Sequence, residues 1–95
     1  MTKTIWKYTL RLIDSQVIEM PRGSNILCVQ LQRDEICLWA LVDPTRLPTG
    51  RHIYIHGTGH PVNHSVYEYK GTFQLDGVTR SCGSSLVFHV FDGGE

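Results

Sequence analysis

The hydrophobic pattern repeats every two residues along most of this chain, and this constrains the fold more than any other feature of the sequence. No stretch places apolar residues at helical spacing over about 11 positions, the length over which an amphipathic helix becomes recognisable. Residues 5–12 alternate most clearly, with Trp, Tyr and Leu side chains on one face and Lys7, Thr9 and Arg11 on the other. Such alternation is typical of a strand with one buried and one solvated face.

Further short runs of β-branched and aromatic residues follow along the chain, separated by turn-forming residues such as Arg33 and Asp34. We expect seven strands, at residues 5–12, 16–20, 26–32, 36–42, 51–56, 67–75 and 86–91. Seven short strands without helices predict an all-β fold, either a small antiparallel β-sandwich or a barrel. No linker or internal repeat divides the sequence, so residues 1–95 are expected to form a single β domain.

Some segments carry more specific structural expectations. Residues 36–42 are apolar on both faces, which favours a strand in the middle of the sheet system with Trp39 in the core. Residues 43–50 contain two prolines and a glycine, which predicts a loop. Gly71 indicates either a β-bulge or the close approach of another backbone. It lies in the run in which we assign one face to Tyr67, Tyr69, Phe73 and Leu75.

Charge and composition exclude several functions. Nine basic and nine acidic side chains cancel to a formal net charge of zero, whereas general nucleic-acid binders and polybasic membrane-surface proteins carry excess positive charge. The longest apolar run, residues 36–42, is far shorter than the roughly 20 residues of a transmembrane helix. No signal-peptide pattern follows the first lysines, and an odd number of cysteines indicates reduced thiols. We therefore expect a cytoplasmic protein without membrane contact or general nucleic-acid binding.

The histidines suggest a metal site at first sight, because His52, His56, His60 and His64 recur every four residues. On a helix they would form one stripe, but Gly57, Gly59 and Pro61 lie inside the repeat and argue against a helix. On a strand, His52 and His56 would lie about 13 Å apart, too far to share one ion directly. A metal held by His60 and His64 remains the minor alternative, and we expect no metal and no cofactor.

No motif indicates an enzyme, since the sequence lacks a nucleophile elbow, a metal-binding HExxH and any cysteine beside an activating group. The more physical candidate is the run from His56 to Pro61, HGTGHP, whose glycines can turn successive N–H groups toward an anion. The same residues are also an ordinary tight turn, which the pattern alone favours. For a phosphorylated ligand, the predicted contacts are Arg51, Tyr54, His56, Gly57, Thr58, Gly59 and His60.

Six segments in order, IWKY, IEMPRGSNILCVQ, LWALVD, HGTGHP, GTFQL and LVFHVF, resemble a family of short proteins of tailed phages and prophages, a domain of unknown function. The resemblance implies a phage origin and a location in the host bacterial cytoplasm, with no established activity. Residues 76–85 depart from the family pattern because they exceed the usual short turn. This segment is either a hairpin tip or a lid that brings Arg80 to a phosphate.

The resemblance and the residues together suggest a non-enzymatic phage accessory protein. It would sequester a nucleotide-type host defence signal or inhibit a host protein. The alternative is a structural or virion-assembly subunit with no small-molecule site. We also expect a homo-oligomer, because small sheet domains expose strand edges. The separation of Lys3, Lys7 and Arg11 from Asp92 and Glu95 is compatible with subunits that meet through opposite charges or with a local anion pocket.

Overall fold

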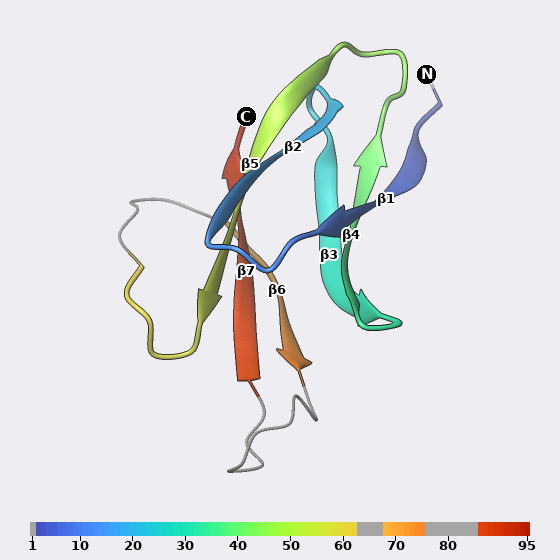
Figure 1. Ribbon diagram of the computed structural model, residues 1–95. Helices are drawn as coiled ribbons and strands as arrows, with labels where there is room; N and C mark the ends of the chain where they lie inside the picture. Colours follow the sequence, from blue (N-terminus) through green and yellow to red (C-terminus); the bar gives the residue numbers. More distant parts are fainter. Residues whose placement is uncertain (1, 63–67, 76–85) are drawn as a thin grey trace.

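The computed structural model describes residues 2–62, 68–75 and 86–95, which form seven strands (Figure 1). Their bounds are β1 (Thr4–Leu10), β2 (Ser15–Pro21), β3 (Asn25–Gln32), β4 (Glu35–Val42), β5 (Pro48–Gly57), β6 (Glu68–Leu75) and β7 (Leu86–Gly94). The prediction of an all-β fold with seven strands is confirmed. These residues include no helix that is long and apolar enough to cross a membrane.

The strands form two antiparallel sheets, one in the order β1-β4-β3 and the other in the order β2-β5-β7-β6. The two sheets stand side by side in Figure 1, and the chain crosses from one to the other between β1 and β2, between β2 and β3 and between β4 and β5. Most pairings join strands that are distant in the sequence, since β1 pairs with β4 and β2 pairs with β5. Consecutive strands pair in β6–β7 and in β3–β4, and the latter is a hairpin whose two connecting residues, Arg33 and Asp34, both have positive φ (52° and 67°). This is the left-handed conformation that a two-residue hairpin turn requires.

The core forms between the two sheets from side chains on alternate positions of the central strands. In β5, Ile53 and Ile55 are buried, while His52, Tyr54 and His56 face outward, as the period of two predicts. In β4 the inward residues are Ile36, Leu38, Ala40 and Val42. Trp39 lies on the other face of β4 and is half-buried, so its prediction as a core residue was wrong. Because this strand is apolar on both faces, its sequence does not show which face packs against the other sheet.

Two strand ends differ from expectation. β1 ends at Leu10, two residues early, so Leu12 belongs to the link between β1 and β2. β5 begins at Pro48 instead of Arg51, and the predicted loop is therefore limited to the turn that follows β4. Pro48 is tolerated because it is the first residue of its strand, where its missing N–H interrupts no ladder. Within the turn, the Thr45 hydroxyl and N–H donate to the Asp43 carboxylate at 2.7 and 3.0 Å, which lowers the pKa of Asp43.

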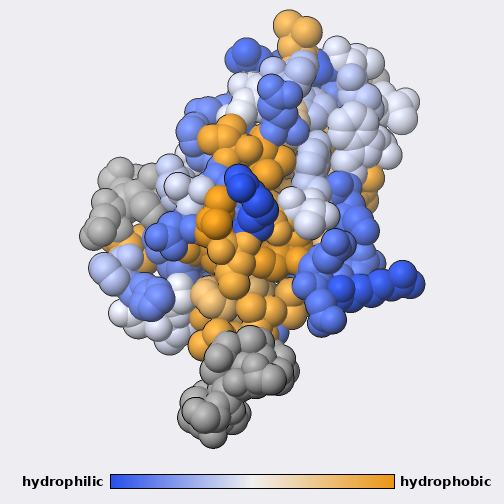
Figure 2. Space-filling model, viewed as in Figure 1, coloured by the Kyte–Doolittle hydropathy of each residue, from blue (hydrophilic) through white to orange (hydrophobic). Residues whose placement is uncertain are grey.

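One side of the molecule leaves apolar side chains uncovered. Figure 2 shows a hydrophobic band running down the middle of this face, bordered by hydrophilic residues. In the link between β1 and β2, Leu12 and Ile13 are 46% and 38% exposed. A hollow of 360 Å³ between the sheets is lined by Leu12, Leu10, Ile36 and Leu75, with Asp34 and Glu35 also beside it. In the part of the chain that the structure describes, apolar side chains such as Leu12 and Ile13 are therefore accessible along this side.

Gly71 explains how the two sheets meet at their other side, where β3 packs against β6. A register shift between Tyr69 and Gly71 marks a bulge in β6. A Cβ atom at Gly71 would lie 3.0 Å from the backbone oxygen of Val29 in β3. Both predicted roles of this glycine, bulge and close approach, are thus confirmed. The bulge moves Tyr69 to the face opposite Phe73, so the expected common face was wrong; Tyr67 lies outside the described residues.

The close approach predicts that Gly71→Ala lowers the free energy of unfolding by about 1–3 kcal/mol, because the added methyl group would press on the β3 backbone. Gly50→Ala is the matched control. Its Cβ would come even closer to a neighbour, 2.7 Å, but that neighbour is a methyl group of the exposed Val17 side chain, which can rotate. Urea denaturation should show the larger loss for Gly71→Ala. A loss at Gly50 as large as that at Gly71 would contradict this packing.

Candidate functional site

A groove lies beside the last residues of β5, where its neighbour β2 has already ended. Ser15 and Tyr54 form the last residue pair of the two strands. One step further, the Ile55 N–H donates to the Asp14 backbone carbonyl at 3.0 Å. Beyond this bond the link to β1 turns away and leaves the edge of β5 open. The resulting groove has a volume of 430 Å³ and is lined by Asp14, Ser15, Tyr54, Ile55, His56, His60 and Pro61.

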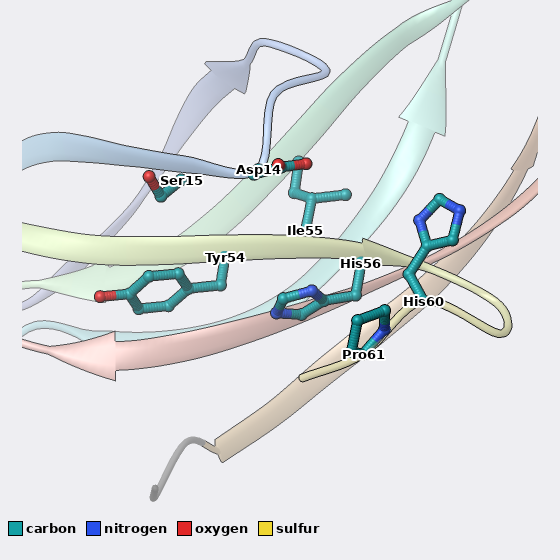
Figure 3. A pocket seen from close by; sticks show the side chains of 7 residues that line it. All are labelled: Asp14, Ser15, Tyr54, Ile55, His56, His60 and Pro61. Carbon is teal, nitrogen blue, oxygen red and sulfur yellow. The ribbon is translucent and has the colours of Figure 1, made fainter. Parts of the chain in front are cut away.

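The groove follows the strand edge, so side chains from both faces of β5 contribute to it. Figure 3 shows Tyr54 and His56 on one side of the strand, and Ile55 with the Asp14 carboxylate on the other. His60 and Pro61 approach from the turn after β5. An aromatic ring, two imidazoles and a carboxylate thus surround one space. Of the ligand contacts predicted from the sequence, the structure brings Tyr54, His56 and His60 together here.

The turn after β5 holds His60 in this position. Gly59 has a positive φ of 90°, and the His60 N–H donates to the Gly57 carbonyl at 3.0 Å, which closes a tight turn. The His60 ring packs on Gly57, where a Cβ atom would lie 3.0 Å from two of its ring atoms. The Thr58 N–H donates to the Val87 carbonyl at 3.1 Å. Two N–H groups that an anion nest would need are therefore used within the protein, so the segment forms the ordinary turn.

His89, which sequence reasoning did not select, ties this turn to the sheet. Its Nε2 lies 2.8 Å from the Thr58 hydroxyl and its Nδ1 lies 3.0 Å from the Thr72 hydroxyl. The Thr72 hydroxyl in turn shares a hydrogen bond with the Tyr69 hydroxyl. Next to this chain, the Phe91 ring meets the rings of His56 and Tyr69 edge to face, at 5.9 Å in both cases. These contacts order the outer face of β5, β7 and β6 under the turn.

Arg51, which the sequence predicted as a ligand contact, does not line the groove. It shares the inward face of β5 with Ile53 and is only 5% exposed. Its guanidinium forms a salt bridge with Asp92 at 3.0 Å and another with Glu95 at 3.6 Å. It also donates to the Ser24 carbonyl. The period of two in a strand places residue 51 and Tyr54 on different faces of β5, so the two side chains cannot line the same groove.

This ion-pair network also changes the interpretation of the charge distribution. The two acidic residues near the C-terminus were expected to be available to another subunit, but they pair with Arg51 inside the same chain. The Glu95 carboxylate additionally accepts the Gly23 N–H at 2.6 Å. That hydrogen bond, with the nearby Arg51 and Arg22 charges, lowers the pKa of Glu95. The network therefore joins the β2–β3 turn to β5 and to the end of β7.

The metal alternative and the lid alternative each depended on a residue near a predicted loop. His64 and the segment with Arg80 lie outside the described residues. Among the residues that are described, no three His, Cys, Asp or Glu side chains are arranged to hold a metal ion. The assignment of Gly57, Thr58 and Gly59 as direct ligand contacts stays a prediction.

The fold and groove define a small two-sheet β domain with one polar, aromatic-lined groove at a strand edge. The chain belongs to the family DUF7352, a domain of unknown function, whose model matches residues 1–95. Comparison with curated proteins gave no match, and neither did comparison with solved structures. The groove must therefore be interpreted from its own chemistry.

The network around Arg51 predicts that Arg51→Ala lowers the free energy of unfolding by about 1–3 kcal/mol, because it leaves the Ser24 carbonyl without its buried donor and the half-buried Asp92 carboxylate without its partner. His52→Ala, one residue further on the outward face, should change it by less than about 0.5 kcal/mol. Urea denaturation followed by tryptophan fluorescence measures both. Arg51→Lys, which keeps the charge, should fall between them. A stable Arg51→Ala variant would contradict the structural role.

The lowered pKa of Glu95 predicts a stability contribution that depends on pH. In the unfolded chain this carboxyl titrates near its ordinary value of 4.5 and in the folded protein below it. Its contribution is therefore complete above 4.5 and is lost as the pH falls through the lower folded value. Glu95→Gln should be destabilising at neutral pH, and the difference from the natural chain should shrink in acid. A pH-independent difference in urea denaturation would contradict this.

Proposed function

We propose that this protein is a non-enzymatic binding module that holds a small ligand in the groove beside the end of β5. The observation that carries the proposal is the convergence of Tyr54, His56, His60 and Asp14 around a 430 Å³ space. Small-molecule sites occupy about 300–1,000 Å³ and combine apolar or aromatic walls with a few placed polar groups. This groove has that composition, and its volume lies toward the lower end of the range.

The local structure supports a preformed site. His60 is held by a closed turn and by its packing on Gly57. The turn is held in place by the hydrogen bond between Thr58 and His89. A ligand therefore meets side chains that are already ordered, which reduces the conformational entropy lost on binding.

The finer proposal follows from the resemblance to short phage proteins. We propose that the ligand is a nucleotide-type signal of the host and that a phage accessory protein sequesters it in the host bacterial cytoplasm. Sequestration requires affinity alone, so a preformed groove without a catalytic step is sufficient for it. Inhibition of a host protein is the variant in which the occupant of the groove belongs to a larger partner.

A second candidate function, an interaction or assembly subunit, is favoured by the uncovered apolar band (Figure 2). Exposed apolar patches of this kind often mark protein interfaces. Asp34 and Glu35 border the apolar hollow, and Lys3 and Lys7 lie on or beside the β1 edge strand. A second copy of this chain would bring these opposite charges together while covering Leu12. The homo-oligomer that the sequence suggested is therefore part of this proposal.

Isothermal titration calorimetry with cyclic dinucleotides, nucleotides and nucleosides tests the first proposal. We expect at least one of these compounds to bind. Its Kd should rise about tenfold or more on Tyr54→Ala or His60→Ala, a loss of about 1.4 kcal/mol of binding free energy. His52→Ala is the matched control, since His52 lies two positions before Tyr54 on the same outward face but does not line the groove.

Absence of heat for the whole panel, with folded protein, would refute the nucleotide version. The interaction-subunit alternative predicts that the oligomeric state does not depend on the residues of the groove. Tyr54→Ala and His60→Ala would then leave the mass measured by light scattering unchanged, whereas Leu12→Asp would reduce an oligomer to single chains.

A further inference from the structure

The groove carries information about the chemical class of its ligand. Resting on the proposed function, and narrowing its nucleotide-type ligand to one recognised by its base, we infer that the groove binds the hydrogen-bonding edge of a planar nitrogen heterocycle of nucleobase type and that a phosphate group weakens binding. The inference depends on three features: the open edge of β5, the rings that flank it and the charge of its lining.

The open edge of β5 presents backbone groups to the groove. The Ile55 N–H points toward β2, where it donates to Asp14. Because the N–H and C=O of one residue in an antiparallel strand point to the same side, and alternate residues share that side, the Ile55 carbonyl and the Gly57 N–H face the same edge. This edge therefore offers one acceptor and one donor side by side, the pattern that complements the edge of a nucleobase.

The open edge is too short to take a peptide strand. It begins where the Ile55 N–H is already bonded to Asp14 and ends at Gly57, whose carbonyl accepts the His60 N–H. The turn that follows brings His60 and Pro61 to the groove (Figure 3). Only two backbone groups remain, far fewer than the ladder of a strand that pairs along a sheet edge. A small flat ligand matches this length.

The side chains around the edge suit a ring with N–H donors. The Asp14 carboxylate can only accept hydrogen bonds when ionised, so it requires a donor such as an exocyclic amino group. Tyr54 and His56 supply aromatic rings beside the edge, and stacking on such rings is tolerant of base identity. Ser15 adds a hydroxyl that can donate or accept.

The charge of the groove disfavours phosphate. Its described lining residues include the Asp14 carboxylate but neither lysine nor arginine. The nearest arginine on β5, Arg51, faces inward and is paired with Asp92. A phosphate beside the Asp14 carboxylate would bring like charges together, with neither lysine nor arginine in the described lining to offset them. Nucleosides should therefore bind better than the matching nucleotides.

The test compares four ribonucleosides with their 5′-monophosphates by titration of ¹H–¹⁵N spectra. At least one nucleoside should shift the backbone resonances of Ile55, His56 and Gly57, and its monophosphate should bind about threefold to tenfold more weakly, as expected for one repelling charge pair near a protein surface. Asp14→Asn should abolish this difference, because it removes the repelling charge while the bond from Ile55 uses the backbone of residue 14. His52→Ala is the control and should keep the difference, because His52 does not line the groove.

A monophosphate that binds as tightly as its nucleoside, or more tightly, would overturn the inference while leaving the proposed binding function intact. The same holds if no nucleoside binds but non-nucleoside fragments shift the resonances of the groove. If no compound of a fragment library shifts those resonances, the proposed function itself fails. An unchanged ratio in Asp14→Asn would overturn the role of that carboxylate.

Discussion

The pairing of β2 with β5, and the point at which it stops, is the constraint on which the candidate site depends. Up to Tyr54, β5 is an interior strand of its sheet, with β2 on one side and β7 on the other. One residue later β2 has ended, and β5 becomes an edge strand on that side. A strand edge normally attracts other strands, but here the turn after Gly57 limits it to a length that suits a small ligand. The groove thus arises from a local mismatch in strand length.

The two faces of β5 contribute to different parts of the domain. Its inward residues form the core and hold Arg51 in an ion-pair network that reaches the β2–β3 turn and the end of β7. Its outward residues, Tyr54 and His56, line the groove. Ile55 belongs to both sets, because it is part of the core and also lines the groove. Substitutions at Arg51 or Ile53 on one face and at Tyr54 or His56 on the other therefore separate stability from the proposed binding. This separation makes His52 useful as a control, because it shares the outward face but lies before the groove.

Local patterns predicted the elements of this fold but not their arrangement. The alternation of apolar and polar side chains identified all seven strands, because this alternation and the turn residues between strands depend only on residues close together in the sequence. It could not show that Asp14 and Ser15 lie beside Tyr54, since a pairing across some forty positions of sequence leaves no local pattern. Tyr69 was assigned to the wrong face because a bulge of one residue inverts the alternation. Arg51 was predicted as a site residue because its guanidinium could bind phosphate. The alternation of the strand instead places it on the inward face of β5, with Ile53.

The β3–β4 hairpin, closed by Arg33 and Asp34, has a consequence for how the molecule folds. A two-residue turn costs little loop-closure entropy, whereas the pairings of β1 with β4 and of β2 with β5 must each close a long loop. Proteins dominated by such distant pairings fold slowly, and this hairpin is the natural place for structure to begin. It belongs to the sheet without the groove. The groove requires the pairing of β2 with β5, so it forms only once that long loop has closed.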